Sequence, residues 1–164
     1  KSIAWEGITM ADKNKKLDAV DTKIIKILQG NSRTTASDIA ESIGMSVPAV
    51  SERLRKLENA NIIDKYTVIL NHRRLGKEIT AIMFVSLSSP DYMEAFNQLI
   101  LTEPDVLECH YVTGEFDYHL KIITSSTYSL EQLLFRIKAA VGVDKTSTYI
   151  VLSSVKLSFP IELV

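Results

Sequence analysis

The stretch TTASDIAESIGMSVPAVSERLRKLE, residues 34–58, predicts two short helices joined by a tight turn. Thr35 can cap the first helix, and Asp38 three residues later completes a capping-box pattern. Gly44 is a typical helix stop, because glycine adopts the left-handed backbone conformation at the end of a helix without steric cost. The segment LDAVDTKIIKILQG, residues 17–30, supplies a preceding amphipathic helix. Three helices with this spacing predict a helix-turn-helix.

The last of these helices has an apolar side and a basic side. Ser46 is its candidate N-cap, and Pro48 falls in the first turn, where a missing N–H costs nothing. At about 100° per residue, Val50, Leu54 and Leu57 cluster on one side. Periodicity alone leaves two interpretations open, a solvated surface helix or a helix whose basic side contacts DNA.

The charge distribution favours the DNA interpretation. Residues 12–77 carry thirteen Lys and Arg against eight Asp and Glu, whereas residues 78–164 carry five against eleven. A basic half of a chain is a candidate for binding a polyanion. Small side chains early in the last helix allow close approach to base edges, and the helix before it would place its N-terminus near a phosphate. The predicted DNA-contacting residues are Thr34, Thr35, Ser46, Val47, Pro48, Ala49, Ser51, Glu52, Arg53, Arg55 and Lys56.

After residue 63 the apolar pattern changes to that of an α+β domain. We predict strands at 66–70, 79–88, 105–113, 116–124 and 146–156, and helices at 91–102 and 127–140. Without the first strand, the order is βαββαβ, the ferredoxin-like pattern in which two helices cover one face of a four-stranded antiparallel sheet. The expected domains are a helix-turn-helix domain at 10–65, a linker strand and connector at 66–78, and a ligand-sensing and oligomerisation domain at 79–164. Residues 1–9 resemble foreign sequence left by expression, ahead of a natural start at Met10.

Strand alternation predicts that the chain self-associates. In the strand at 79–88, Ile82 and Phe84 face one way, while Met83 and Val85 face the other. Both faces are therefore apolar, yet two helices can cover only one of them. A large apolar face is seldom left in water, so we expect at least a homodimer.

Two separated segments resemble one known family. LDAVDTKIIKILQGNSRTTASDIAESIGMSVPAVSERLRKLENANII (17–63) resembles the helix-turn-helix of the Lrp/AsnC, or feast/famine, transcription regulators of bacteria and archaea. VLECHYVTGEFDYHLKI (106–122) resembles the strand-turn-strand of the effector domain of that family, centred on a Thr-Gly-acidic-aromatic-Asp motif. TSTYIVLSSVK (146–156) resembles its last strand. The resemblance spans about residues 17–158, and is strongest to the leucine-responsive regulators.

This resemblance implies a winged-helix-like domain that binds double-stranded DNA, a linker strand and a βαββαβ domain that binds a free amino acid. It also implies homodimers through the second domain, often assembled as a tetramer of dimers into an octamer, and a cytoplasmic, nucleoid-associated location. The positions that match the effector site of the family are Thr113, Gly114, Glu115, Phe116, Asp117 and Tyr118, with Thr146 and Thr148 opposite.

Physical chemistry supports two interpretations of the loop around Gly114. Backbone N–H groups beside a residue without a side chain can bind the carboxylate of an amino acid, and Asp117 can accept hydrogen bonds from its ammonium group. Alternatively, Gly114 turns a hairpin and Asp117 caps it. The residues alone leave both interpretations open, and the resemblance favours ligand binding.

No pattern in the sequence indicates catalysis. Cys109 and His110 are neighbours in a predicted strand and point to opposite faces, so they cannot bind one metal together. No metal-ligand spacing, flanked nucleophile or phosphate-binding glycine loop is present, which predicts no enzyme activity, no metal and no cofactor besides the effector. A single cysteine forms no internal disulfide, and no apolar run reaches membrane-spanning length. The predicted function is a sequence-specific transcription regulator whose assembly or DNA affinity is modulated by a small effector, an amino acid. The alternatives are a nucleoid-type DNA-organising protein of low sequence specificity and a metabolite-sensing module that does not bind DNA.

Overall fold

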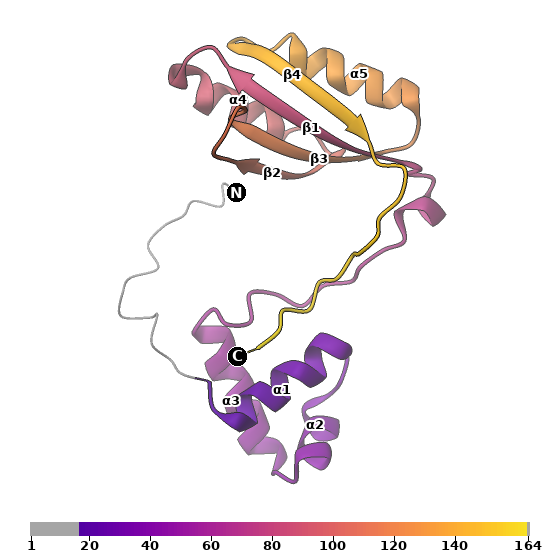
Figure 1. Cartoon of the computed structure of the whole chain (residues 1–164). Coiled ribbons are helices and arrows are strands. Elements are labelled where there is room, and N and C mark those ends of the chain that lie inside the picture. Colours follow the sequence, from indigo (N-terminus) through magenta and orange to yellow (C-terminus); the bar gives the residue numbers. More distant parts are fainter. Residues whose placement is uncertain (1–16, 164) are drawn as a thin grey trace. The chain divides into compact units, whose positions relative to one another are not determined.

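The computed structural model describes residues 17–163, so the predicted foreign segment at 1–9 lies outside the described residues. The chain forms two compact units (Figure 1). The helical unit consists of residues 17–69 together with 158–163, and the sheet unit consists of residues 70–157. No helix of the described residues is long and apolar enough to cross a membrane.

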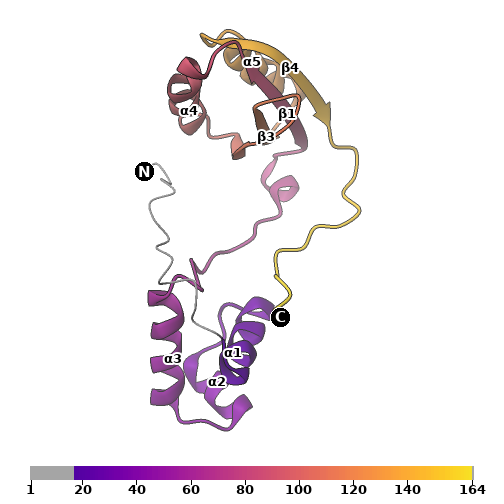
Figure 2. The same ribbon diagram turned by 60° about the vertical axis from the view of Figure 1, so that its left-hand side comes forward.

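The helical unit contains the three predicted helices: α1 (Ala19–Gly30), α2 (Ala36–Ile43) and α3 (Val47–Asn59), as Figures 1 and 2 show. Reciprocal capping boxes start α1 at Asp18 and α2 at Thr35, and the second of these was predicted. Gly44 ends α2 with a left-handed φ of 69°. Ser46 occupies the N-cap position of α3, as predicted, but its side chain makes no capping hydrogen bond. Pro48 lies in the first turn of α3, as predicted.

The core of the helical unit confirms the apolar side of α3. Val50 and Leu57 are fully buried against Ile24 of α1 and Ile39 of α2, and Leu54 packs at the edge of the cluster. Because each helix contributes at least one fully buried side chain, none of the three can be displaced without exposing apolar surface.

The sheet unit has the predicted βαββαβ order. Its elements are β1 (Ile79–Leu87), α4 (Met93–Leu101), β2 (Val106–Tyr111), β3 (Tyr118–Thr124), α5 (Thr127–Lys138) and β4 (Val143–Ile150), with short 3₁₀ turns at His72–Leu75 and Pro90–Tyr92. All pairings are antiparallel, in the spatial order β2-β3-β1-β4. The α+β prediction with a four-stranded antiparallel sheet is thereby confirmed.

One face of the sheet is covered and the other is open. Met83 and Val85 of β1 are fully buried in a cluster with residues of α4 and α5, which lie on the same side of the sheet (Figures 1 and 2). Ile82 and Phe84 point to the opposite side and are only partly buried. The predicted alternation of β1 is therefore confirmed. We call the uncovered side, centred on Phe84, the open sheet face.

Two predicted strands differ from the structure. Residues 66–70 do not pair with another strand, so the predicted linker strand is absent from the single chain. The strand predicted at 146–156 begins earlier and ends at Ile150, leaving Leu152 and Val155 exposed. Extended, β-branched sequence becomes a strand only where a neighbour accepts its backbone hydrogen bonds, and in one chain these segments have none.

The turn before β4 fits tightly against the start of α4. Gly142 has a φ of 87°, and a Cβ atom placed on it would lie 2.1 Å from a ring carbon of Tyr92. Its carbonyl oxygen accepts a 2.8 Å hydrogen bond from the N–H of Ser88. Both the backbone conformation and the available space thus require glycine at this position.

Candidate DNA-binding surface and effector loop

The outward side of α3 carries most of the predicted DNA-contacting residues. We call it the recognition surface; its exposed members are Ser46, Val47, Pro48, Ser51, Arg55 and Lys56, and its half-buried members are Ala49 and Glu52. The first turn is formed by small side chains and Pro48, so that the backbone of α3 can approach a DNA groove closely, and the charged side chains follow one to two turns later.

An ion-pair cluster organises the charged part of the recognition surface. Arg55 donates to both carboxylate oxygens of Glu52, at 3.0 Å from Nε and 2.7 Å from Nη2, and the Nζ of Lys56 lies 3.4 Å from the same carboxylate. The hydrogen bond from Arg55 holds the pKa of Glu52 below its usual value. Such a solvent-accessible pair contributes little to stability, so a phosphate or a guanine can take the place of Glu52 as the partner of Arg55.

Arg53 points away from the recognition surface, toward α1. Its Nη1 donates to Asp18 at 2.6 Å and to Asp21 at 2.7 Å, and its side chain is 29% exposed. These bonds, the one to Asp18 foremost, raise the pKa of Arg53. Arg53 therefore positions α3 against the start of α1, a role that helical periodicity could not reveal because the partners lie on another helix.

The two predicted threonines lie at the start of α2. The Thr35 hydroxyl accepts the N–H of Asp38 at 3.2 Å in the capping box and also donates to the Asp38 carboxylate at 2.7 Å. The Thr34 hydroxyl donates to the carbonyl of Asn31 at 2.8 Å. Both side chains thus fix the N-terminus of α2, where the helix dipole favours a phosphate.

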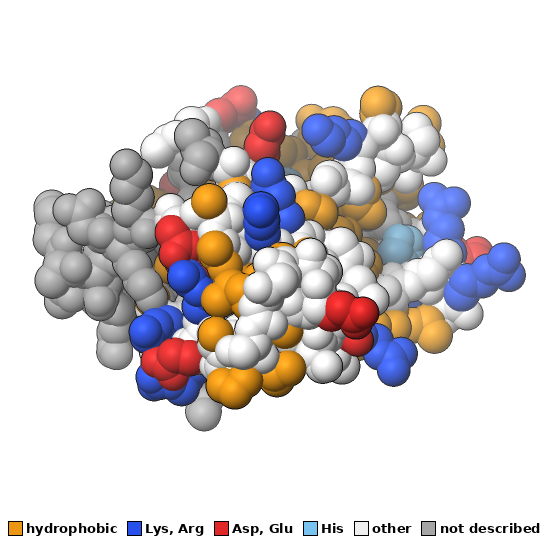
Figure 3. Space-filling view, turned by 90° about the horizontal axis from the view of Figure 1, so that it is seen from below, with side chains coloured by type: hydrophobic (Ala, Val, Ile, Leu, Met, Phe, Trp, Pro, Cys, Tyr) orange, Lys and Arg blue, Asp and Glu red, His pale blue; other side chains and the backbone are white. Residues whose placement is uncertain are grey.

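On the face drawn in Figure 3, the basic side chains do not merge into one continuous patch. In Figure 3, Lys and Arg side chains form several separate groups among acidic and uncharged ones on the face in view. Contact with DNA would then depend on where individual residues lie, such as Arg55 and Lys56, more than on a uniform positive field.

The predicted effector loop, residues 112–117, connects β2 to β3 and is tied to the end of β1. Asp117 donates its N–H to the carbonyl of Val85 at 3.0 Å, and its carboxylate accepts a 2.7 Å bond from the N–H of Leu87. Gly114 has a φ of 130° with open space where a Cβ would lie. One oxygen of Asp117 is thereby used to hold the loop, which agrees with the capping interpretation, while the turn at Gly114 stays accessible.

Lys145 joins this loop to the start of β4. Its Nζ is paired with the Glu115 carboxylate and lies 5.0 Å from the centroid of the Phe116 ring. The bond to Glu115 raises the pKa of Lys145. Sequence reasoning missed Lys145 because the last strand was predicted to start one residue after it.

The remaining predicted effector residues do not share this surface. Thr146 and Thr148 pair with Val85 and Met83, so their side chains belong to the helix-covered side of the sheet. Tyr118 is buried, with its ring 4.7 Å from that of Phe96. The structure thus brings Glu115 and Phe116 of the loop together with Lys145, and places Tyr118, Thr146 and Thr148 on the other side of the sheet.

Family comparisons cover both units of the chain. Residues 17–64 match a winged helix-turn-helix DNA-binding family, and residues 80–161 match the Lrp/AsnC ligand binding domain. The leucine-responsive regulatory protein of Haemophilus influenzae is 35% identical over 147 residues, which is 88% of this chain and 89% of that protein.

Solved structures agree with these matches over nearly the whole chain. A transcriptional regulator from Neisseria meningitidis, in complex with L-methionine, superposes with a TM-score of 0.85 at 28% identity, covering 90% of this chain and 97% of its own. A feast or famine regulatory protein from Mycobacterium tuberculosis, also complexed with L-methionine, gives a TM-score of 0.79 at 28% identity and covers 87% and 96%. The chain with its helix-turn-helix and its ligand-binding domain belongs to the Lrp/AsnC family of transcriptional regulators, which are DNA-binding proteins and not enzymes.

Proposed function

We propose that this protein is a sequence-specific regulator whose DNA affinity or assembly responds to a free amino acid in the cytoplasm of a bacterium or archaeon. The observation that carries the proposal is the presence, in one chain, of an exposed recognition surface on α3 and an accessible loop at 113–117 in a ligand-binding domain. The L-methionine in two related structures supports an amino acid as the effector class.

The charge arrangement favours specific recognition over nucleoid-type binding. Glu52 neutralises part of the charge of Arg55 and Lys56 in the middle of the recognition surface. A protein that binds DNA by charge alone gains nothing from a carboxylate there, because each phosphate contact adds affinity regardless of sequence. A carboxylate that accepts from a cytosine amino group, by contrast, contributes to base discrimination.

The function is tested by genome-wide footprinting with and without a panel of amino acids. We expect discrete protected sites, bound at least about 1,000-fold more tightly than random DNA in competition, and changed occupancy with one or a few amino acids. Equal affinity for footprinted and random fragments would favour the nucleoid-type alternative instead. Absence of any DNA binding would favour the sensing module.

We further propose that the protein dimerises through the open sheet face and that dimers assemble into octamers. Phe84 is the centre of an aromatic cluster on this face, with ring centroids 5.5 Å from Phe116, 5.2 Å from His119 and 6.2 Å from Tyr149. An apolar, aromatic surface of this kind on a face that no helix covers is typical of a subunit interface.

Replacing Phe84 with aspartate is expected to dissociate the dimer. A charge at the centre of the interface would be desolvated without a partner, which should raise the dimer dissociation constant at least about 100-fold. Analytical ultracentrifugation at micromolar concentration measures the change. Tyr128→Asp, on the exposed side of α5, is the matched control and should sediment as the wild-type protein does. A monomeric wild-type protein would refute the proposed interface.

Replacing Asp117 with alanine is expected to abolish the amino-acid response. The substitution releases the bond to the N–H of Leu87 and removes an acceptor for the ammonium group, so that loop 112–117 is deprived of both its anchor and a group that binds the ligand. Calorimetric titration with the effective amino acid should show no binding, while effector-free operator affinity stays within about twofold of wild type. Glu131→Ala on α5 serves as the control. A normal titration with the Asp117 variant would exclude this loop from the effector site.

A further inference from the structure

The last residues of the chain return to the helical unit. After β4 the sequence VKLSFPIEL, residues 155–163, alternates strictly between apolar and polar side chains up to Phe159, as an amphipathic strand does. It follows the sheet unit in sequence, yet residues 158–163 pack with the helices. We call residues 158–163 the C-terminal strap.

The strap makes specific contacts with the helical unit. The side-chain amide of Gln29, near the end of α1, donates a 3.1 Å hydrogen bond to the carbonyl of Ile161. Leu163 packs against the apolar cluster of the three helices. Phe159 and Pro160 line a groove of about 600 Å³.

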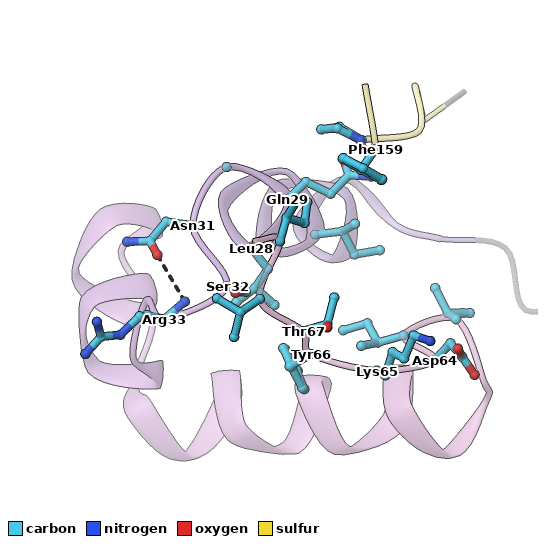
Figure 4. Close-up of a pocket in the computed structure, with 17 residues that line it drawn as sticks. Leu28, Gln29, Asn31, Ser32, Arg33, Asp64, Lys65, Tyr66, Thr67 and Phe159 are labelled. Atoms are coloured by element: carbon cyan, nitrogen blue, oxygen red, sulfur yellow. Dashed lines mark hydrogen bonds between the residues drawn. The ribbon is translucent and has the colours of Figure 1, made fainter. Parts of the chain in front are cut away.

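The other walls of this groove come from two segments of the same unit. One wall is the end of α1 with the turn that follows it, and the other is the extended segment 62–69. Figure 4 shows Phe159 beside Gln29, with Tyr66 and Thr67 projecting from the extended segment. An extended segment thus lies in a groove of the helical unit, where side-chain packing and the bond from Gln29 hold it.

The docking is shallow enough to be reversible. Phe159 remains 54% exposed and Ile161 remains 74% exposed, and one side-chain hydrogen bond holds the backbone of the strap. Segments with few buried contacts detach at a low cost in free energy. Elements that move in regulation usually belong to such segments.

The position of the strap suits the transmission of a signal. It is continuous in sequence with β4, which begins beside Lys145, the partner of Glu115 in the effector loop. No residue that lines the groove belongs to the recognition surface, so the strap can remain docked while α3 contacts DNA. A docked strap ties the helical unit to the chain that follows β4 by noncovalent contacts, in addition to the covalent linker at 66–78, and so reduces the freedom of the helical unit to reorient.

We propose that the C-terminal strap, docked in the groove beside Gln29 of its own chain, is a latch that couples the state of the effector loop to DNA binding. This inference rests on the proposed function, because coupling requires that an amino acid alters operator affinity. The effector biases the latch only to the extent that it binds the latched and unlatched states differently.

Chemical crosslinking tests whether the strap occupies its groove. Gln29→Cys combined with Ile161→Cys, in a Cys109→Ser background, should give an intramolecular product with a short bismaleimide, detected as a faster-migrating monomer on a denaturing gel. Ile161→Cys alone should give none. A crosslinked dimer in place of this product would show that the strap of a second copy fills the groove, and would overturn docking within one chain.

Truncation after Leu157 tests the coupling. The wild-type change in operator affinity on adding the effective amino acid is expected to be about 5- to 150-fold, and the truncated chain should show about none. Amino-acid binding by calorimetry and effector-free operator binding should both persist. Leu152→Ser, an exposed residue before the strap, is the control and should respond as wild type does. Gln29→Ala should weaken the response partly.

Failure of the coupling and failure of the proposed function would give different results. A responsive wild-type protein whose truncated form responds equally would overturn the coupling alone. A wild-type protein that binds its operator but responds to no amino acid would contradict the proposed function and the coupling together, even if crosslinking showed the strap in its groove.

Discussion

Replacement of Arg55 by alanine is expected to weaken operator binding by about 10- to 100-fold, because it removes a contact to a phosphate or a guanine in each half-site. The free energy of unfolding should hardly change, since the ion pair of Arg55 is with Glu52 on its own helix and is open to solvent. Lys56, which also pairs with Glu52, would retain that partner. The effect of Arg55→Ala should therefore appear in DNA binding alone.

Arg53→Ala is the informative comparison, because the two arginines are two residues apart on one helix. Asp21 is 7% exposed, and removing Arg53 leaves its carboxylate without the guanidinium that holds it. We expect the free energy of unfolding to fall by about 1 to 3 kcal/mol, the usual cost of losing a hydrogen bond to a charged group, because the Asp21 carboxylate would retain the long bond from the N–H of Asp18. DNA affinity should decrease only to the extent that the loss of Arg53 shifts α3 from its position against α1.

Fluorescence anisotropy at several salt concentrations separates these roles. Removal of Arg55 should reduce the slope of log affinity against log salt by about one for each phosphate that the protein no longer touches, whereas removal of Arg53 should leave the slope unchanged. Chemical denaturation supplies the stability of each variant. An unchanged affinity and slope for Arg55→Ala would refute the recognition surface as assigned, and a reduced slope for a fully stable Arg53→Ala would restore Arg53 as a DNA-binding residue.

Gly142→Ala is expected to destabilise the sheet unit by about 3 kcal/mol or more. A non-glycine residue at a φ of 87° is strained, and its Cβ would overlap the ring of Tyr92. The backbone cannot shift freely to relieve the overlap, because the Gly142 carbonyl is bonded to the N–H and the hydroxyl of Ser88. The destabilisation from backbone strain and the destabilisation from overlap with Tyr92 should therefore add.

Thermal unfolding followed by circular dichroism measures this destabilisation, which should lower the midpoint of the sheet unit by more than about 10 °C. Gly30→Ala is the matched control: Gly30 ends α1 with an ordinary φ, and a Cβ there meets no atom within 4 Å. That variant should be as stable as the wild type or slightly more stable. Equal midpoints for the two variants would show that the turn before β4 tolerates a side chain.

Local signals were sufficient to predict the helical unit. Helix caps and stops act within three or four residues, which is why the capping box at Thr35 and the stop at Gly44 could be recognised in the sequence. The buried Val50 and Leu57 also followed from periodicity, because a helix with a single apolar side has only one way to face a core.

Signals that depend on distant partners were missed. Arg53 was predicted to contact DNA from its place on the helix, and its bonds to acidic residues at the start of α1 could not be predicted because those residues are at least 32 positions away in sequence. Thr148 was predicted to belong to the effector site, and the sequence did not reveal that its register opposite Met83 puts its side chain on the covered side of the sheet. Register is set by pairing with another strand, and a single sequence does not specify which residues will be opposite one another.

The two separate apolar clusters have an evolutionary consequence. Ile24 and Leu57 belong to one cluster and Met83 and Leu133 to the other, with no buried residue in common. A substitution that alters the recognition surface therefore leaves the packing of the sheet unit intact. A substitution in the effector loop likewise leaves the packing of the three helices intact. Such a chain can acquire a new operator while keeping its amino acid, or a new amino acid while keeping its operator, so that one scaffold can diversify into many regulators by independent steps.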